Sequence, residues 1–167
     1  MWLWWSGLSR RLPSQQSGKF TCSSTNVLIL AGKALRSSGQ VATQPLIATE
    51  QFGAGGVDTV RGYLDRERFG DNAYDIQMEV RAPSFTHVFG GRLEERIQPL
   101  VFWDTSELWT LADPTQPSTQ SRLAGAGVGV RASFFDHVNA ELFYASPLIH
   151  TEESTRPRFH FKVAVGF

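Results

Sequence analysis

The sequence predicts an all-β protein. Its 167 residues include twelve Phe, five Trp and fifteen Gly, a composition that favours aromatic strands and tight turns over helices. Several segments also alternate between apolar and polar residues, with the period of two that a β-strand requires. The longest uninterrupted apolar run, residues 27–31, is far too short for a membrane-spanning helix, so any crossing of a membrane would need a barrel.

Two segments show the alternation most clearly. Residues 73–83 and the C-terminal residues 158–167 each place apolar side chains on one parity and polar side chains on the other. The polar parities comprise Asp75, Gln77, Glu79 and Arg81, and then Arg158, His160 and Lys162. The apolar parities comprise Tyr74, Ile76, Met78 and Val80, and then Phe159, Phe161, Val163, Val165 and Phe167. Each segment therefore has one charged face and one apolar face.

Other segments complete a set of about six strands. We expect the remaining strands over residues 26–46, 97–109, 122–132 and 138–145, the last two joined as a hairpin at 134–137. The connections alternate in length, with short turns near Pro83 and Asp136 and longer loops over 47–72, 110–121 and 147–156. Such alternation is typical of a barrel with short turns on one rim and long loops on the other.

Strand pattern alone leaves two architectures open. Alternating strands also build soluble sandwiches and small barrels, and the signal from each segment of a membrane barrel is weak. The charged parities favour the membrane version, because its lumen is wet while its exterior contacts lipid. On this ground we expect an antiparallel transmembrane β-barrel.

Charge and motifs argue against several functional classes. The 16 Lys and Arg residues are balanced by 16 Asp and Glu residues, which argues against nucleic-acid binding. Cys22 is the single cysteine, so the chain has no disulfide framework and no C-x-x-C pair. The four histidines lack metal-ligand spacing, the glycine runs at 53–56 and 125–129 fit no nucleotide-binding motif, and no nucleophile elbow is present. We expect no enzyme activity, no metal and no cofactor.

The loop over residues 47–72 contains a segment that generic turn chemistry does not explain. Its length of about 25 residues is unusual unless a loop is functional. Near its centre, Val60, Arg61, Gly62 and Tyr63 form an apolar-Arg-Gly-aromatic tetrapeptide. The loop is therefore expected to be ordered.

This tetrapeptide resembles the V-R-G-[F/Y] loop motif of the outer-membrane transporters of two-partner secretion, the haemolysin activation/secretion proteins (ShlB, FhaC and HecB-like) among the POTRA-containing barrels. Gln40, Pro45-Leu46, residues 50–52 and Gly55-Gly56 precede it, as in the family. Residues 102–106 resemble the family's F-x-D-x-G barrel-wall motif, although Ser106 replaces the usual glycine. Residues 123–131 resemble its glycine-rich strand, and the chain ends in an aromatic-terminated strand.

The resemblance implies a barrel of about sixteen strands whose V-R-G-Y loop folds back into the lumen, where Arg61 would meet Asp104. A guanidinium in a partly dry lumen needs a bidentate carboxylate, so this pair would pin the loop to the wall. The residues expected to line the lumen are Asp75, Gln77, Glu79, Arg81, Asn139, Glu141, Arg158, His160 and Lys162. The residues expected to face lipid, on the strand that the barrel assembly machinery would recognise, are Phe159, Phe161, Val163, Val165 and Phe167.

Family members carry a signal peptide and two POTRA domains ahead of the barrel, which cannot fit ahead of Asn26. We therefore expect an atypical, disordered or mis-started stretch over residues 1–25 and the C-terminal part of a barrel over 26–167. The implied function is a translocation pore in the cell outer membrane. Its partners would be a large secreted exoprotein, outer-membrane lipid and the barrel assembly machinery, with no nucleic acid. The alternatives are a barrel-assembly insertase of the BamA kind, a soluble ligand-binding β-barrel and a non-functional remnant.

Overall fold

The computed structural model describes residues 21–30, 32–86, 95–112, 117–134 and 137–166. All of its regular elements are strands, so the expected all-β class is confirmed. In this part of the chain, no helix is long and apolar enough to cross a membrane.

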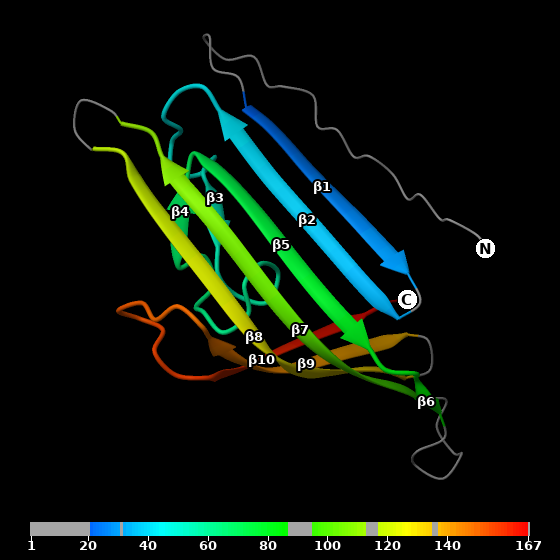
Figure 1. The fold of residues 1–167 in the computed structure, drawn as a ribbon. Helices are drawn as coiled ribbons and strands as arrows, with labels where there is room; N and C mark the ends of the chain where they lie inside the picture. Colours follow the sequence, from blue (N-terminus) through cyan, green and yellow to red (C-terminus); the bar gives the residue numbers. More distant parts are fainter. Residues whose placement is uncertain (1–20, 31, 87–94, 113–116, 135–136, 167) are drawn as a thin grey trace.

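A single antiparallel sheet dominates the fold, in the order β1-β2-β5-β7-β8-β9-β10, with β6 paired to β7 (Figure 1). The seven strands along this path are β1 (Thr21–Leu30), β2 (Lys33–Ala42), β5 (Asn72–Arg81), β7 (Glu95–Thr110), β8 (Thr119–Phe134), β9 (Val138–Pro147) and β10 (Arg158–Val165). Each long strand pairs with the next long strand along the chain. Among the described residues the sheet is not closed, and β1 and β10 form its two ends.

The strand expected over residues 26–46 is wrong, because this segment contains a turn. The chain forms β1 and β2, ten residues each, and reverses at Gly32, whose φ of 78° lies in the left-handed region that glycine adopts readily. The apolar run at 27–31 hides this turn in the sequence. Strand β1 begins at Thr21, so residues 21–25 belong to a strand and not to the atypical N-terminal stretch; residues 1–20 lie outside the described residues.

The short turn expected near Pro83 is also wrong. The connection from β5 to β7 spans residues 82–94. Beyond β5 the chain stays beside β7, since the Ala82 amide donates to the Pro99 carbonyl at 2.9 Å and β6 (Phe85–Thr86) continues the pairing. The pairing with β7 thus continues past Pro83, the residue near which we expected the chain to reverse.

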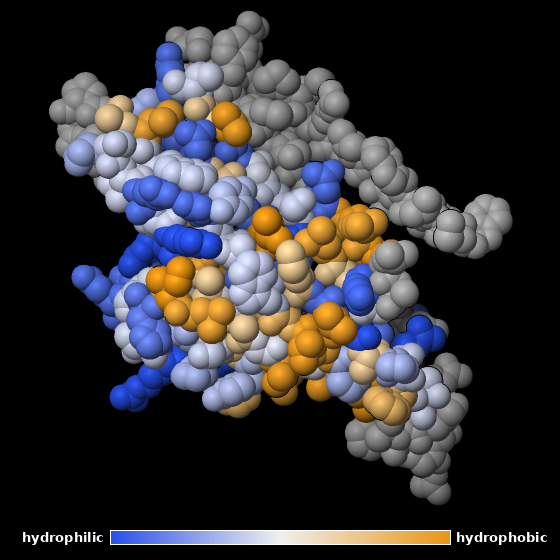
Figure 2. All heavy atoms as spheres, viewed as in Figure 1, coloured by the Kyte–Doolittle hydropathy of each residue, from blue (hydrophilic) through white to orange (hydrophobic). Residues whose placement is uncertain are grey.

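The two faces of the sheet differ in polarity, as the alternation requires. On β5, Asp75, Gln77 and Glu79 are buried on the face that carries the long loop, whereas Met78 and Val80 are exposed on the other. On β10, the apolar side chains of the other parity, Phe159, Phe161, Val163 and Val165, are 58 to 79% exposed. We call the loop-bearing side the inner face and the opposite side the outer face. Figure 2 shows apolar side chains gathered over the middle of the displayed face, with hydrophilic residues toward its left edge.

The core forms between the inner face and residues 43–71, the connection from β2 to β5, which we call the inner loop. It contains a small hairpin of β3 (Phe52–Ala54) and β4 (Arg68–Gly70). One apolar cluster joins the loop to the sheet, and its members are Ala54, Val60, Tyr63, Ala73, Leu108 and Leu123. A second cluster, on the inner face of β7 and β9, comprises Leu100, Phe102, Phe143 and Ala145, with Val57 of the loop against it. The loop therefore acts as the second layer of the fold.

Replacing Leu123 by alanine should destabilise the fold far more than replacing Leu142. Leu123 is 1% exposed under the inner loop, so truncation leaves a cavity and should cost about 2 to 5 kcal/mol. Leu142 is 52% exposed on the outer face and should cost much less. Urea unfolding of both variants in detergent micelles measures the difference, and equal losses would contradict the placement of the core.

Candidate functional site

The tip of the inner loop, residues 60–63, is buried against the inner face. A tight turn ahead of the tip sets its path: the Gly55 amide donates to Thr59 Oγ1 at 2.8 Å and the Gly56 amide to the Val60 carbonyl at 3.1 Å. Gly55 and Gly56 have φ values of 115° and 92°, which explains the glycines of this segment. This turn directs the Arg61 side chain toward the inner face of the sheet.

Arg61 makes a bidentate ion pair with Asp104 of β7. Its Nε donates to Asp104 Oδ2 at 2.7 Å, its Nη2 donates to Oδ1 at 2.8 Å, and its own backbone amide donates to Oδ2 at 3.1 Å. Arg61 is 2% exposed and Asp104 0%. Both charges are thus removed from water, and each depends on the other for compensation.

Glu79 extends the pair into a charge network. It accepts from Arg61 Nη1 at 2.9 Å, from Arg81 at 2.9 and 3.0 Å, and from Arg131 at 2.7 and 2.9 Å. Arg131 also donates to Glu141 at 2.7 Å. Three arginines and three carboxylates, drawn from the inner loop and from β5, β7, β8 and β9, therefore balance one another.

Two aromatic rings flank the Arg61 guanidinium. Its central carbon lies 3.7 Å from the centroid of the Phe102 ring and 4.8 Å from that of Phe143. These two rings meet edge to face, with centroids 5.7 Å apart. Cation–π contact adds stabilisation where the cation is desolvated, and the rings keep water away from the ion pair.

Gly62 and Tyr63 complete the docking of the tip. Gly62 has a φ of 104°, and a Cβ there would lie 3.0 Å from the Pro147 nitrogen and from the Ser146 carbonyl carbon. The Tyr63 hydroxyl oxygen lies within hydrogen-bonding distance of two carbonyl oxygens, that of Ala124 at 2.7 Å and that of Ile149 at 2.6 Å, and its single proton can be donated to either. The tip is thus held by β7 through Arg61, and by β8 and the β9–β10 connection through Tyr63.

The glycine-rich stretch of β8 provides room for the tip and for Phe143. A Cβ on Gly125 would lie only 2.0 Å from the Arg61 carbonyl oxygen, and one on Gly129 would lie 2.3 Å from Phe143 Cδ1. Missing side chains on one parity of this strand therefore let another piece of chain approach closely.

Two carboxylates fix other parts of the inner loop. Asp71 holds the end that joins β5, and Glu67 holds the segment that follows the tip. Asp71 accepts from the amides of Leu46 at 2.8 Å and Leu111 at 2.6 Å. Glu67 accepts hydrogen bonds from Thr151 and Ser154 of the β9–β10 connection and from the Leu64 amide. Partial burial of Glu67 favours its neutral form, but these hydrogen bonds outweigh that effect and lower its pKa.

The residues expected to line the lumen all lie on the inner parity of their strands, and most contact the loop or the network. Gln77 donates to the Thr59 carbonyl, His160 accepts from the Gly62 amide at 3.0 Å, and Lys162 pairs with Asp58 at 2.7 Å. Arg158 donates to the Glu153 carbonyl at 2.6 Å, and Asn139 is exposed. The Asp75 carboxylate is buried, and neither of its oxygens has a hydrogen-bond partner among the described residues. A cavity of about 250 Å³ lies among these charged side chains, beside Arg61 and Glu79.

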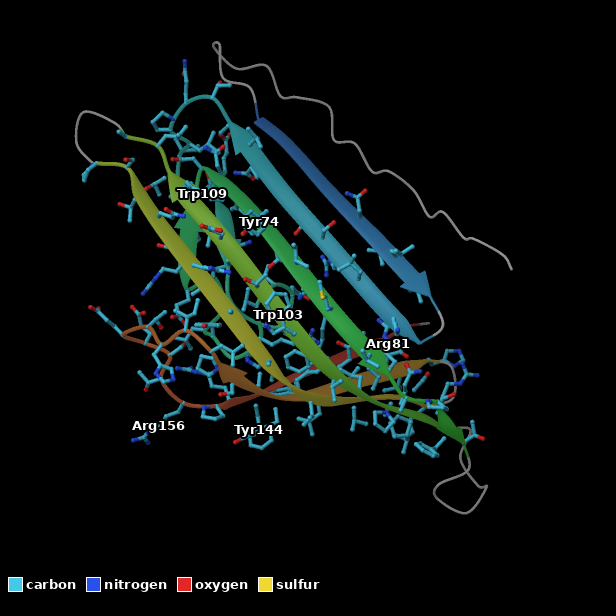
Figure 3. The ribbon with its side chains drawn as sticks, viewed as in Figure 1. Tyr74, Arg81, Trp103, Trp109, Tyr144 and Arg156 are labelled. Carbon is cyan, nitrogen blue, oxygen red and sulfur yellow. The ribbon has the colours of Figure 1, made fainter. Side chains whose placement is uncertain are left out.

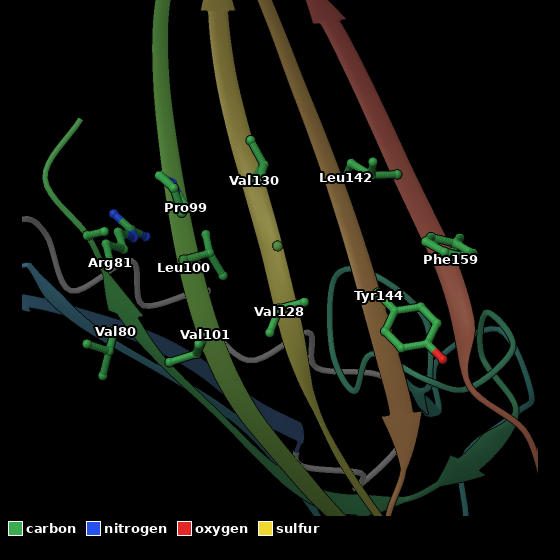
Figure 4. Close-up of a pocket in the computed structure, with 12 residues that line it drawn as sticks. Val80, Arg81, Pro99, Leu100, Val101, Val128, Val130, Leu142, Tyr144 and Phe159 are labelled. Atoms are coloured by element: carbon green, nitrogen blue, oxygen red, sulfur yellow. The ribbon is translucent and has the colours of Figure 1, made fainter. Parts of the chain in front are cut away.

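The apolar residues of the C-terminal strand lie on the outer face, away from the inner loop. The Phe159 ring packs against that of Tyr144 at 4.9 Å, and Tyr144 points away from the sheet (Figure 3). An open apolar groove of about 570 Å³ runs across this face between β5 and β10 (Figure 4). Phe167 lies outside the described residues.

Several site residues were missed by the sequence analysis. Asp71 and Glu67 make contacts across 40 and 87 positions, which no local pattern reveals. Phe143 had a visible signal, because it follows Asn139 and Glu141 on the polar parity of its strand, where an aromatic ring is out of place. Among the described residues, no group of three or more His, Cys, Asp or Glu side chains could hold a metal ion.

The fold and site together define a class of protein. A curved antiparallel sheet, polar within and apolar outside, with a loop docked on its inner face, is the arrangement of the wall of a transmembrane β-barrel. The family model described as haemolysin secretion/activation protein ShlB/FhaC/HecB matches residues 8–132. The chain belongs to this family, which confirms the resemblance. No curated protein matches the chain.

Replacing Gly125 by alanine should release the loop tip without removing any charge. The added methyl group would collide with the Arg61 carbonyl, and such overpacking should raise tryptic cleavage after Arg61 about tenfold. Gly166 is the matched control, because nothing lies within 4 Å of a Cβ there. Unchanged protection of Arg61 in the Gly125→Ala variant would contradict the close approach.

Proposed function

We propose that this chain forms part of the wall of a protein-translocation pore of two-partner secretion, located in the cell outer membrane. Its partner is a large secreted exoprotein. The main observation behind this proposal is the docked inner loop. The Arg61–Asp104 pair holds it on the polar inner face of a sheet whose outer face is apolar. Family membership supports protein transport and not an enzyme activity.

The division of faces supports a membrane setting. The outer face exposes apolar side chains over β5, β7, β8, β9 and β10, which a soluble ligand-binding barrel would bury. Tyr74 and Trp109 lie side by side on that face at the long-loop ends of β5 and β7, with ring centroids 5.8 Å apart (Figure 3). Aromatic pairs at this position suit the interface between hydrocarbon and water.

The open sheet supports a role as part of a larger barrel. In hydrocarbon, each unpaired backbone group of an edge strand costs several kcal/mol, so β1 and β10 need partner strands. The barrel assembly machinery would bind the C-terminal strand, through the exposed apolar side chains of β10 and through Phe167. The insertase alternative shares the Arg61 and Asp104 motifs, and no observation in the structure favours it over secretion.

The inner loop gives the pore its gate. Docked as it is, it fills the space along the inner face of the wall, and an exoprotein passing through the lumen would meet Arg36, Arg131 and Lys162 beside it. Moving the loop requires breaking the Arg61–Asp104 pair. The pair is therefore a latch whose strength sets how readily the lumen opens.

A secretion assay with a chimera tests this proposal. Residues 21–167 would replace the corresponding part of a complete transporter of the family, and the exoprotein in the medium would be measured. We expect secretion by the chimera, and at least about a tenfold loss with Arg61→Ala, because removing one partner leaves a buried charge unpaired. The exposed Arg156→Ala is the matched control.

Barrel assembly would be followed in the same cells by heat-modifiable migration in gels. Secretion at the parental level by Arg61→Ala would remove the latch role. An assembled chimera that secretes no exoprotein would contradict the proposed function.

A further inference from the structure

We propose that His160 is a positioning residue for the loop tip, and that it holds the tip only while its imidazole is neutral. This inference rests on the proposed function, in which docking of the inner loop controls the lumen. It adds a proton-dependent link between the loop and β10, the strand at one end of the sheet.

The hydrogen bond at the tip fixes the protonation state of His160. The Gly62 amide lies 3.0 Å from His160 Nε2. A backbone N–H can only donate, so Nε2 must present a lone pair and the ring proton must sit on Nδ1. An imidazolium carries protons on both nitrogens and has no acceptor for this amide.

Gly62 is the residue of the docked tip that β10 contacts through this bond. It lies between Arg61, which bonds to β7, and Tyr63, which bonds to β8. Gly62 is buried against the backbone of residues 146–147, so losing its acceptor would leave a buried amide without a partner. His160 is thereby the partly buried connection from β10 to the tip.

The second connection from β10 to the loop is much weaker. Lys162 pairs with Asp58, but their side chains are 49% and 69% exposed. Exposed ion pairs of this kind contribute little to stability. Removing the His160 bond would therefore leave β10 with little hold on the loop.

Some of the charges around His160 disfavour its protonation, and one favours it. Arg61 of the tip and Arg158 of β10 repel an imidazolium, whereas Asp65 of the loop attracts it. The facing residue on β9 is Phe143, which is uncharged. Protonation would place a second cation beside the Arg61 pair at the same moment that it removes the acceptor for Gly62.

Nuclear magnetic resonance of the full 167-residue chain in detergent micelles tests the inference without any secretion assay. Labelling glycine and histidine with ¹⁵N reports the Gly62 amide and both ring nitrogens of His160 between about pH 5 and pH 8. We expect the Nδ1–H tautomer at the upper end of that range. As the pH falls, the Gly62 amide resonance should move with the same midpoint as His160.

Three variants separate positioning from simple packing. His160→Gln keeps an acceptor that does not titrate, so the Gly62 amide should stay at its docked position at every pH. His160→Leu removes the acceptor, so the docked resonance should be lost at every pH and tryptic cleavage after Arg61 should rise about tenfold. His150→Gln changes an exposed loop histidine and is the control. In this variant the Gly62 amide should respond to pH as it does in the parent chain.

Three results would overturn the inference. They are an Nε2–H tautomer of His160, a Gly62 resonance that ignores the titration, and a His160→Leu chain whose Gly62 amide remains docked. Because the resonances are read without an exoprotein, a docked and titrating loop in a chain that fails the secretion assay would contradict the proposed function alone.

Discussion

The buried guanidinium of Arg61 is the constraint on which the rest of the structure depends. A cation that is 2% exposed requires carboxylates with matching geometry, and Asp104 and Glu79 meet it with three side-chain hydrogen bonds of 2.7 to 2.9 Å. Those carboxylates lie on β7 and β5, so the pair fixes the register at which the loop meets the sheet. The remaining arginines of the network balance Glu79, which would otherwise be an excess buried charge.

The surroundings of this pair follow from the same need. Phe102 and Phe143 exclude water from the guanidinium, and the glycine-rich stretch of β8 lets the loop backbone come close enough for contact. The outer face has no buried charge to compensate among the described residues, and it is apolar along most of its length. One sheet thus combines a wet, charged interior with a surface suited to lipid.

The sequence predicted the strands with clear alternation and the family, and it failed where turns and distant contacts decide the outcome. The period of two in β5 and β10 is set by the pleat, so it was visible without a structure. The turn at Gly32 was hidden in an apolar run, and β6 continues a ladder past Pro83 that local chemistry could not foresee. Arg61 and Asp104 were named through motifs. Glu67 and Asp71 were not, because their partners are remote in sequence.

A double-mutant cycle on Arg61→Ala and Asp104→Ala tests the central claim most directly. Chymotryptic cleavage after Tyr63, which is fully buried while the tip is docked, measures release of the loop. If the two charges hold the tip together, each single change should raise cleavage strongly and the double change no further, a coupling of at least about 2 kcal/mol. Additive effects of the two changes would show that Arg61 and Asp104 act independently, and would contradict the latch.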